Sequence, residues 1–395
     1  MIIVFIYILL IISILSSFYF IIIGKTHIVK AVTITILSRN YGPSIYDFRF
    51  FRKNKIYASK QHKKISHSSS QKLALTQNLI DYNLKFKTTG LQIIKGNNIL
   101  FEEYYLGAND KTIINSFSIA KTVLSFLVGI AILEKKINSL DDNISDYLPE
   151  YEKYRSRNIT IKHLLNMTSG FDWVDRYSIK ETFLRIYYGN NVNDFLLKRG
   201  FKHLPGKKFK YSSGSTQLVS IILSRVISCS ISEYATEKLW KPMGMTSDAY
   251  WFVDNTGFEK TFTGLCCNLN DLTKIGLLLK NGGKYEGQQI VPKRFIDTMI
   301  MRNANSYSGF DAVWIDYKNE HPKFYLTSGY KGQYIIVIPE HDILITRTGK
   351  EHNRDIDFKK GVYFPSDIYF IIEEVLVALN SKNSTPKKPS KEVIN

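Results

Sequence analysis

The feature that most constrains the fold is an apolar run from Thr122 to Leu133, twelve residues without a charge. A run of that length is too short to cross a bilayer, which takes about 20 residues. Its residues are apolar on nearly every side of a helix, which predicts a helix that begins near Phe117 and is buried within a domain. The chain must therefore fold around this helix, and polar groups in its first turn are carried inside the protein.

Two polar groups stand in that first turn, Ser118 and Lys121. Side chains three residues apart share one face of a helix, so the hydroxyl and the amine can meet. Burial disfavours a charged ammonium and can turn a lysine into a proton acceptor, which would activate the serine to attack a carbonyl. Free N–H groups at the start of the helix would then hold the oxyanion. A structural serine near a helix end is the alternative, and the local pattern leaves both open.

The spacing Ser-x-x-Lys occurs four times in the chain, since Ser69, Ser328 and Ser384 also start such a pattern. Ser69 and Ser384 lie in polar stretches rich in serine or lysine, without a helical apolar pattern. Ser328 follows a strand-like run. Only Ser118 opens a long apolar helix, and it is therefore the candidate nucleophile.

Tyr211 is the second candidate for catalysis. It follows the turn Pro205-Gly206 and stands just before a predicted helix. A tyrosine near a cationic lysine loses its proton more readily and can relay a proton between nucleophile and leaving group. The alternative is that one of 25 tyrosines packs in a loop, which the residue pattern alone favours.

Composition and missing motifs exclude several classes of protein. The net charge of +18 would suit nucleic acid, but the catalytic portion has no dense basic stripe with interleaved aromatics, so we expect no nucleic-acid partner. Three cysteines, two of them adjacent, give neither a disulfide framework nor a zinc spacing. The chain contains no Gly-x-Ser-x-Gly, His-Glu-x-x-His or Gly-x-x-x-x-Gly-Lys sequence. We therefore predict neither a metal nor an organic cofactor.

The N-terminus predicts a membrane anchor. Ile2–Ile23 holds 22 residues without a charge, enough to cross the roughly 30 Å of a bilayer core. No basic residue precedes this run and no clear cleavage signature comes after it, so an uncleaved anchor over residues 1–24 is expected. Ten basic residues lie between positions 25 and 64, where Asp47 is the only acid. They favour a cytoplasmic location for the chain beyond the anchor; contact with lipid head groups or a solvated linker also explains them.

The rest of the chain divides into three further segments. Residues 25–72 read as a basic linker with weak local structure, 73–380 as a globular domain, and 381–395 as a disordered polar tail. Within the domain, a hairpin is expected over 91–105. Helices are expected at 160–170, 178–188, 192–198, 216–227, 231–239, 270–280 and 367–379, and strands at 323–326, 334–338 and 343–346. Consecutive strands with helices inserted between sheet segments predict an α+β fold with an antiparallel sheet.

Six segments resemble, in the same order, the β-lactamase-related serine hydrolases, which include class C β-lactamases, D-alanyl-D-alanine carboxypeptidases, esterases and 6-aminohexanoate-dimer hydrolases. The segments are Ser118–Lys121, Ser139–Pro149, Ile161–Gly170, Pro205–Ser213, Leu239–Met245 and Gly332–Glu340. The residues around Asp172-Trp173 and Gly332-Gln333 are closer to the aminohexanoate-dimer-hydrolase and esterase branch. The resemblance, over Leu91–Leu379, implies a β-lactamase/transpeptidase-like fold with a helical subdomain.

The resemblance also implies roles for individual residues. Ser118 would be the acylated nucleophile, Lys121 its base or hydrogen-bond partner, and Tyr211 the proton relay. Ser213 stands where the family's Tyr-x-Asn motif has Asn, and we place it among the substrate-binding residues. The oxyanion hole would use the Ser118 N–H and one N–H from residues 329–333.

One family motif, Lys/His-Thr-Gly, is missing from the strand where it is expected. Ser328-Gly329 is the nearest substitute, and both residues are candidates for substrate binding. Arg347-Thr-Gly comes one strand too late. Without the basic residue, binding of a substrate carboxylate is weakened, and with it the case for β-lactams or D-alanyl-D-alanine peptides.

These expectations combine into a membrane-anchored serine hydrolase that cleaves a small or peptide-like amide or ester through an acyl-enzyme. Relatives of this architecture mostly act outside the cytoplasm, and long domains are translocated despite flanking charge, so the hydrolase domain is expected on the extracytoplasmic side. Two alternatives stay open: a sensor-like module that is acylated with little turnover, and an inactive scaffold.

Overall fold

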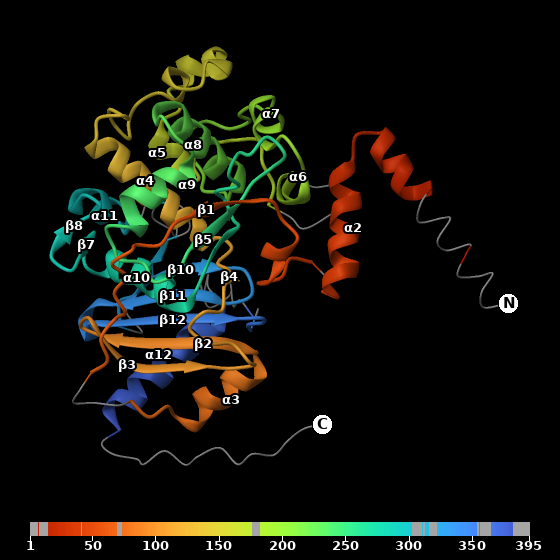
Figure 1. Ribbon diagram of the computed structural model, residues 1–395. Helices are drawn as coiled ribbons and strands as arrows, with labels where there is room; N and C mark the ends of the chain where they lie inside the picture. Colours follow the sequence, from red (N-terminus) through yellow and green to blue (C-terminus); the bar gives the residue numbers. More distant parts are fainter. Residues whose placement is uncertain are drawn as a thin grey trace.

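Antiparallel sheets with helices packed around them make up the structure, a computed structural model (Figure 1). It describes residues 15–40, 42–68, 73–175, 182–301, 313–315, 322–353 and 365–381, and the single residues 7, 310 and 355. Within this part of the chain, the predicted α+β class with an antiparallel sheet flanked by helices is confirmed.

The elements have the following bounds. The strands are β1 (Lys53–Ile56), β2 (Thr88–Lys95), β3 (Asn98–Tyr104), β4 (Ile114–Asn115), β5 (Ala249–Phe252), β6 (Leu265–Cys267), β7 (Lys284–Tyr285), β8 (Gln288–Gln289), β9 (Val313–Ile315), β10 (Tyr325–Gly329), β11 (Gln333–Ile338) and β12 (Ile343–Gly349). The α-helices are α2 (Thr26–Ser38), α3 (Gln77–Lys85), α4 (Ile119–Leu133), α5 (Ile161–Leu165), α6 (Thr182–Tyr188), α7 (Val192–Leu197), α8 (Ser213–Val226), α9 (Ile231–Ala235), α10 (Leu269–Lys280), α11 (Lys293–Met299) and α12 (Ser366–Asn380). Shorter helical turns are η1 (Asp47–Arg49), η2 (Ile144–Asp146), η3 (Pro149–Arg157), η4 (Thr236–Trp240) and η5 (Pro339–His341).

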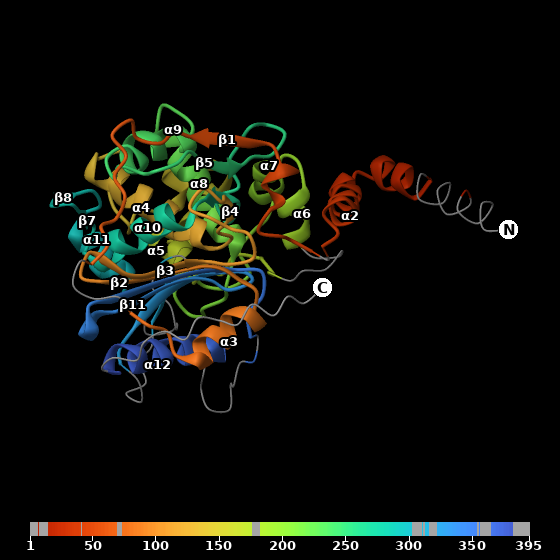
Figure 2. The same cartoon turned by 60° about the horizontal axis from the view of Figure 1, so that its bottom comes forward.

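The larger sheet has the strand order β3-β2-β12-β11-β10-β9, and all neighbouring strands are antiparallel. Strand β11 is buried on both faces: Ile335 and Val337 enter one hydrophobic core, and Ile336 and Ile338 enter the other. A strand buried on both faces has no polar side, so its sequence is a continuous apolar run. Helices α3 and α12 cover one face of this sheet, and α10 with most other helices lies over the opposite face (Figure 2).

Helix α4 lies inside the larger core, as the apolar run predicts. Every residue from Ile119 to Ala131 is buried. The side-chain oxygens of Thr122 and Thr327 lie 2.6 Å apart and tie the helix to β10. This contact fixes α4, the helix that follows the predicted nucleophile Ser118, against the larger sheet.

The sequence patterns predict where the helices lie more accurately than they predict the residues at which the helices begin and end. Of the helix expected over 160–170, the structure has α5, which ends at Leu165, because Met167 takes a left-handed backbone conformation with φ of 55°. Helix α8 begins at Ser213, three residues earlier than expected, because Ser212 caps it.

The segment expected to be a weakly structured linker, residues 25–72, is more ordered than that expectation. It contains α2, η1 and β1, and β1 pairs with β5 in a smaller sheet of order β1-β5-β6-β4. Phe51 and Ile56 are buried in the larger core. The short sequence of β1 has no apolar alternation, so this strand depends on its pairing partner rather than on local propensity.

More than half of the predicted anchor, residues 1–24, lies outside the described part of the chain. Within the anchor, residues 15–22 are described and helical. Among the described residues, no single helix is long and apolar enough to cross a membrane. Helices α8 and Ile231–Trp240 reach that length and composition only as a pair, which is bent by 83°. Most of the predicted tail, residues 382–395, also lies outside the described part.

Candidate active site

Ser118 stands at the start of α4, directly after a strained turn. Phe117 has φ of 51°, a conformation that bulky residues rarely adopt. Asn115 holds this turn by accepting the Phe117 N–H at 2.9 Å. Backbone strain of this kind clusters at active sites. The Ser118 N–H meets no acceptor among the described residues, so it is open to a developing negative charge at the helix N-terminus.

Lys121 lies beside Ser118, the predicted nucleophile, and is enclosed by protein, with 1% of its surface exposed. Its Nζ is 3.0 Å from Ser118 Oγ and donates to the Phe262 carbonyl oxygen at 2.6 Å. None of the ion pairs among the described residues includes Lys121. This geometry places the Lys121 amine where a base for Ser118 would stand.

Tyr211 reaches the same oxygen from a distant part of the chain. Its hydroxyl donates to Ser118 Oγ at 2.9 Å, across 93 positions in sequence, and Lys121 Nζ lies 5.3 Å from its ring centre. The neighbouring Ser212 caps α8 by accepting the Ser215 N–H at 3.0 Å, which fixes the loop that carries Tyr211. The structure thus brings the three predicted catalytic residues together.

Ser118 and Tyr211 face a pocket of about 170 Å³ with mostly aromatic walls. It is lined by Pro43, Phe117, Ser118, Asp175, Phe183, Tyr187, Tyr211, Ser213, Phe262, Thr263 and Tyr330. Apolar walls with a few convergent polar groups are typical of small-molecule sites. The pocket suits the apolar portion of a small substrate, with its carbonyl at Ser118.

Ser213 and Asp175 form the polar part of this lining. The Ser213 N–H donates to Asp175 Oδ2 at 2.7 Å, whereas Asp175 Oδ1 is buried without a hydrogen-bond partner among the described residues. Burial raises the pKa of Asp175, and the nearby charge of Lys121 acts in the opposite direction. The sequence pattern predicts Ser213 but not Asp175, because 38 positions separate the two and no spacing rule joins them.

Ser328 and Gly329 lie at the end of β10, beside the nucleophile's turn, and are not among the described residues that line the pocket. Gly329 passes so close to Ser116 that an added Cβ would collide with the Ser116 carbonyl oxygen. Tyr330, the next residue, lines the pocket and packs edge-on against the Phe117 ring, 5.6 Å between centres. A role of Ser328 and Gly329 in substrate binding stays a prediction.

Arg347 in β12 does not replace the missing basic motif. It is fully buried. Its guanidinium donates to Thr88 Oγ1 at 3.0 Å and to the carbonyl oxygens of Gly332 at 2.7 Å and Phe86 at 3.0 Å. These bonds hold the sheet to its flanking loops, so Arg347 is a structural residue.

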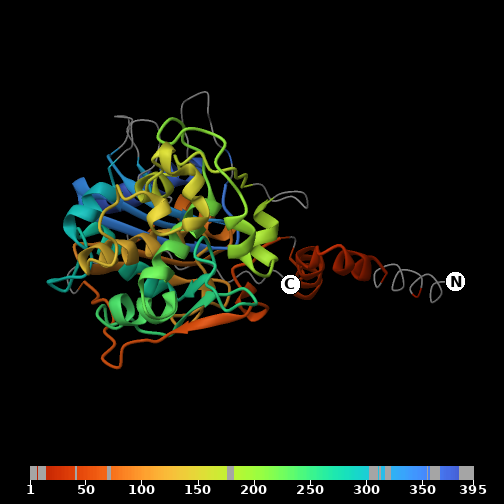
Figure 3. The same cartoon turned by 90° about the horizontal axis from the view of Figure 1, so that it is seen from above.

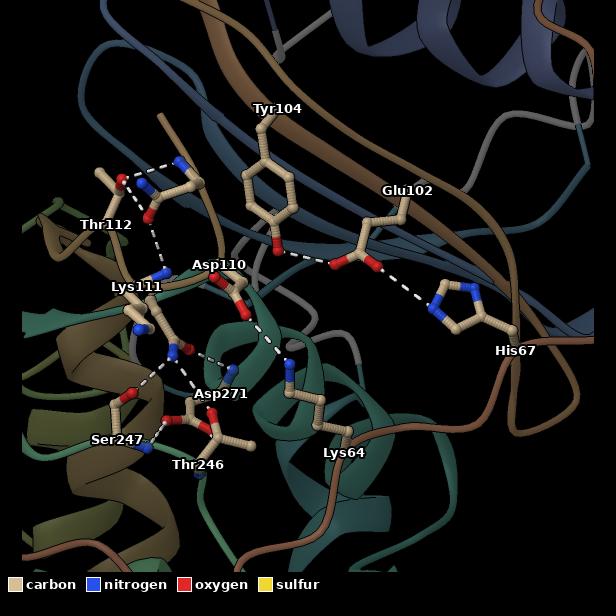
Figure 4. Close-up of polar contacts among 12 residues, drawn as sticks. Lys64, His67, Glu102, Tyr104, Asp110, Lys111, Thr112, Thr246, Ser247 and Asp271 are labelled. Atoms are coloured by element: carbon tan, nitrogen blue, oxygen red, sulfur yellow. Dashed lines mark hydrogen bonds and ion pairs between the residues drawn. The ribbon is translucent and has the colours of Figure 1, made fainter. Parts of the chain in front are cut away.

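A second and larger pocket, of about 550 Å³, lies at the β3 edge of the larger sheet. Figure 4 shows its polar contacts: Tyr104 donates to Glu102 at 2.6 Å, His67 Nε2 lies 3.4 Å from the same carboxylate, and Lys64 pairs with Asp110 at 3.0 Å. Glu102, His67, Lys64 and Asp110 thus each have a polar or charged partner within this pocket. In the described residues, no group of three or more His, Cys, Asp or Glu side chains is placed to hold a metal ion.

The sequence is similar to known proteins over most of the globular domain. The model of the family described as Beta-lactamase matches residues 77–355, more than half of the chain. The 6-aminohexanoate-dimer hydrolase of Paenarthrobacter ureafaciens is 24% identical over 243 residues, which cover 58% of this chain and 61% of that protein. Protein flp of Staphylococcus aureus is 32% identical over 143 residues, 34% of this chain and 28% of that protein. The chain thus spans less than two thirds of either relative.

Solved structures share the fold at low sequence identity. A Bacillus anthracis protein provisionally assigned as a 6-aminohexanoate-dimer hydrolase has a TM-score of 0.71 at 18% identity, over 85% of this chain and 92% of its own. A family VIII carboxylesterase has a TM-score of 0.60 at 14% identity, over 76% and 96%. A penicillin-binding protein from Bacillus halodurans has 0.59 at 17% identity, over 76% and 99%. These likenesses show a β-lactamase/transpeptidase-like fold.

Proposed function

Because the chain belongs to the Beta-lactamase family, we propose that it is a serine hydrolase that cleaves an amide or ester bond through an acyl-enzyme on Ser118. One observation carries the proposal: Ser118 Oγ lies 3.0 Å from Lys121 Nζ and 2.9 Å from the Tyr211 hydroxyl. A nucleophile with a base and a second proton-transfer group at hydrogen-bond distance is the minimum that acyl transfer requires.

The proposed mechanism uses these three groups in turn. A neutral Lys121 amine accepts the Ser118 proton as Oγ attacks the carbonyl carbon. The oxyanion is held by the Ser118 N–H and by one N–H of residues 329–333. Tyr211 donates its proton to the leaving amine or alcohol. When water cleaves the acyl-enzyme, the Tyr211 oxygen takes a proton from the attacking water, and Lys121 returns its proton to Ser118 Oγ. No metal or organic cofactor enters these steps.

Features of the pocket favour esters and linear amides over β-lactams. The strand β10 offers Thr327-Ser328-Gly329 where a lysine or histidine would bind a substrate carboxylate. The aromatic walls and the single small polar corner at Ser213 suit an acyl or alkyl group. One similar protein is named a 6-aminohexanoate-dimer hydrolase and another a carboxylesterase, and these names refer to hydrolysis of a linear amide and of an ester.

We further propose that residues 1–24 anchor the chain in a membrane, with the hydrolase domain on the extracytoplasmic side. The support is the charge-free run Ile2–Ile23 and its length. A fluorescent reporter fused after Asn395 tests the side of the membrane. Fluorescence only in the cytoplasm would overturn this part of the proposal.

A serine-directed fluorophosphonate tests the proposed chemistry. The expected result is labelling of Ser118, loss of labelling in Ser118→Ala, and rapid hydrolysis of short-chain p-nitrophenyl esters by the unmodified protein. A stable adduct without ester turnover would instead indicate a sensor-like module. No labelling at all would indicate an inactive scaffold. A panel of short-chain esters, linear amides and a chromogenic β-lactam then narrows the substrate class.

A further inference from the structure

Helix α2 presents an apolar surface that the rest of the described chain does not cover. Its residues His27, Ile28 and Ile34 are buried. Val32 and Ile36, four positions apart and therefore on one face, are 52% and 67% exposed, and Leu37 is 63% exposed. Lys30 is the one charged residue of the helix. A helix of this composition, apolar on the side that faces away from the protein, is suited to lie in a membrane surface.

This surface is continuous with the rest of the N-terminal segment. Ten of the eighteen large apolar side chains that the described residues expose lie between residues 7 and 37. Scattered exposed apolar residues need no explanation, whereas a concentration in one short segment does. The exposed basic residues Lys25 and Arg39 flank the two ends of α2, where they would meet anionic head groups.

Helix α2 packs against the folded domain next to α6, a helix that lines the pocket at Ser118. It lies against α6, and the two helices are side by side in Figures 1 and 3. On α6, Phe183 and Tyr187 line the pocket that holds Ser118. Lys30 Nζ lies 4.8 Å from the ring centre of Phe51, a residue of the larger core. The apolar surface of α2 is thus one helix away from the site of catalysis.

The chain that leaves α2 also runs directly to this pocket. Pro43, five positions after the last residue of α2, lines it. Five residues span at most about 17 Å even when extended. Beyond Pro43, the Ile45 carbonyl accepts the Asn115 N–H at 2.7 Å, and Asp47 accepts the Tyr187 hydroxyl at 3.2 Å. The segment next to the predicted anchor therefore builds part of the active site.

We propose that α2 lies in the surface of an anionic bilayer with Val32, Ile36 and Leu37 among the acyl chains, and that the Ser118 pocket receives acyl esters dissolved in that same bilayer. The proposal rests on the proposed function and adds to it a substrate class, esters of fatty acids. In the reaction, Ser118 Oγ replaces the alcohol on the acyl carbon, Lys121 takes the serine proton, and the alcohol leaves with a proton from Tyr211. Water then releases the fatty acid and restores all three groups.

The test compares a water-soluble and a bilayer-resident ester, with the full chain in phosphatidylcholine vesicles that contain phosphatidylglycerol. The double variant Val32→Asp/Ile36→Asp should lower hydrolysis of p-nitrophenyl laurate by about tenfold or more, because charged residues lift α2 from the apolar layer, and leave p-nitrophenyl acetate within about twofold. The matched control Leu84→Asp/Val377→Asp changes residues of α3 and α12 that are 60% and 55% exposed. It should change neither rate.

A second readout does not depend on activity. Ile36→Cys in a Cys229→Ser background, labelled with an environment-sensitive fluorophore, should shift to shorter wavelength with these vesicles and be quenched by brominated acyl chains. Absence of both effects, or laurate hydrolysis that is equal in wild type and double variant, would overturn the proposal. Self-association of the chain through α2 in place of vesicle binding would do the same. If Ser118-dependent acetate hydrolysis is absent in wild type, the proposed function fails instead, and the fluorophore still decides the position of α2.

Discussion

The pocket at Ser118 and the larger pocket at the β3 edge differ in size and in the partners of their polar groups. The larger pocket holds more titratable groups, but Glu102 accepts a hydrogen bond from Tyr104 and lies beside His67, and Lys64 pairs with Asp110. In the smaller pocket, Lys121 is buried beside Ser118 outside any ion pair of the described residues. The comparison teaches that volume and number of charges do not locate a reactive site. A hydroxyl with two proton-transfer groups at hydrogen-bond distance, as Ser118 has in Lys121 and Tyr211, is the better guide.

The largest expected effect separates the two pockets by activity. Ser118→Ala should lower ester hydrolysis by roughly 10⁴-fold or more, because no other group in the pocket forms the acyl-enzyme. Glu102→Gln in the larger pocket should leave kcat/KM within about twofold, since it alters a satisfied surface network. Steady-state hydrolysis of p-nitrophenyl acetate measures both. Comparable losses in the two variants would remove the distinction between the pockets.

Replacing the buried amine tests what makes the smaller pocket reactive. Lys121→Met keeps the length of the side chain but cannot accept a proton, so acylation should slow by about 10³-fold. The matched change Lys64→Met removes an exposed, paired amine in the larger pocket and should have no effect on acylation. Stopped-flow measurement of the first turnover isolates this step. An unchanged burst rate in Lys121→Met would refute the assignment of Lys121 as the base.

Loss of the Tyr211 hydroxyl should depend on the leaving group. Tyr211→Phe should slow hydrolysis of a linear anilide by about 10²-fold to 10³-fold, because an amine must be protonated as it departs. The effect on a p-nitrophenyl ester should be smaller, since p-nitrophenolate leaves without a proton. The ratio of kcat/KM for the two substrates measures the difference. Equal losses would indicate that Tyr211 positions Ser118 rather than transferring a proton.

The parts of the site that were predictable from sequence are those fixed by local geometry or by motif order. Ser118 and Lys121 meet because three positions along a helix share a face. Tyr211 was predicted because six segments of the chain resemble the family in the same order. The prediction of the family is confirmed. The predicted catalytic roles are still to be tested by the variants above.

The parts that escaped prediction depend on the folded path of the chain. Phe117 takes its positive φ in the turn between β4 and α4, where its N–H donates to Asn115 Oδ1, and no local propensity of a bulky residue encodes this conformation. Pro43 lies in a stretch without periodicity, and it reaches the pocket only because the N-terminal segment is held against the domain by β1 and α2. Patterns along a sequence report faces of helices and strands, and they do not report which loops meet.

A buried carboxylate behind the catalytic pocket extends the comparison to stability. Asp47 is fully buried; its Oδ2 accepts the Ser44 N–H at 2.9 Å and the Tyr187 hydroxyl at 3.2 Å, whereas Oδ1 has no partner among the described residues. Burial raises the pKa of Asp47 from 3.8 to about 6. The folded protein therefore holds this proton more tightly than the unfolded chain does. The associated stability is complete below about pH 4 and is lost as the pH rises through about 6.

The smallest expected effect follows from that shift. Relative to Asp47→Asn, which cannot ionise, the wild type should lose about 1–3 kcal/mol of unfolding free energy between about pH 4 and pH 7. Urea unfolding of the full chain in detergent at several pH values measures the difference, and other buried acids such as Asp271 and Asp367 contribute equally to both proteins and cancel. Asp110→Asn in the larger pocket should show little pH-dependent difference, because its exposed pair with Lys64 is screened by solvent. Parallel pH profiles for wild type and Asp47→Asn would mean that water reaches this carboxylate and that the wall behind Ser118 is more open than the structure has it.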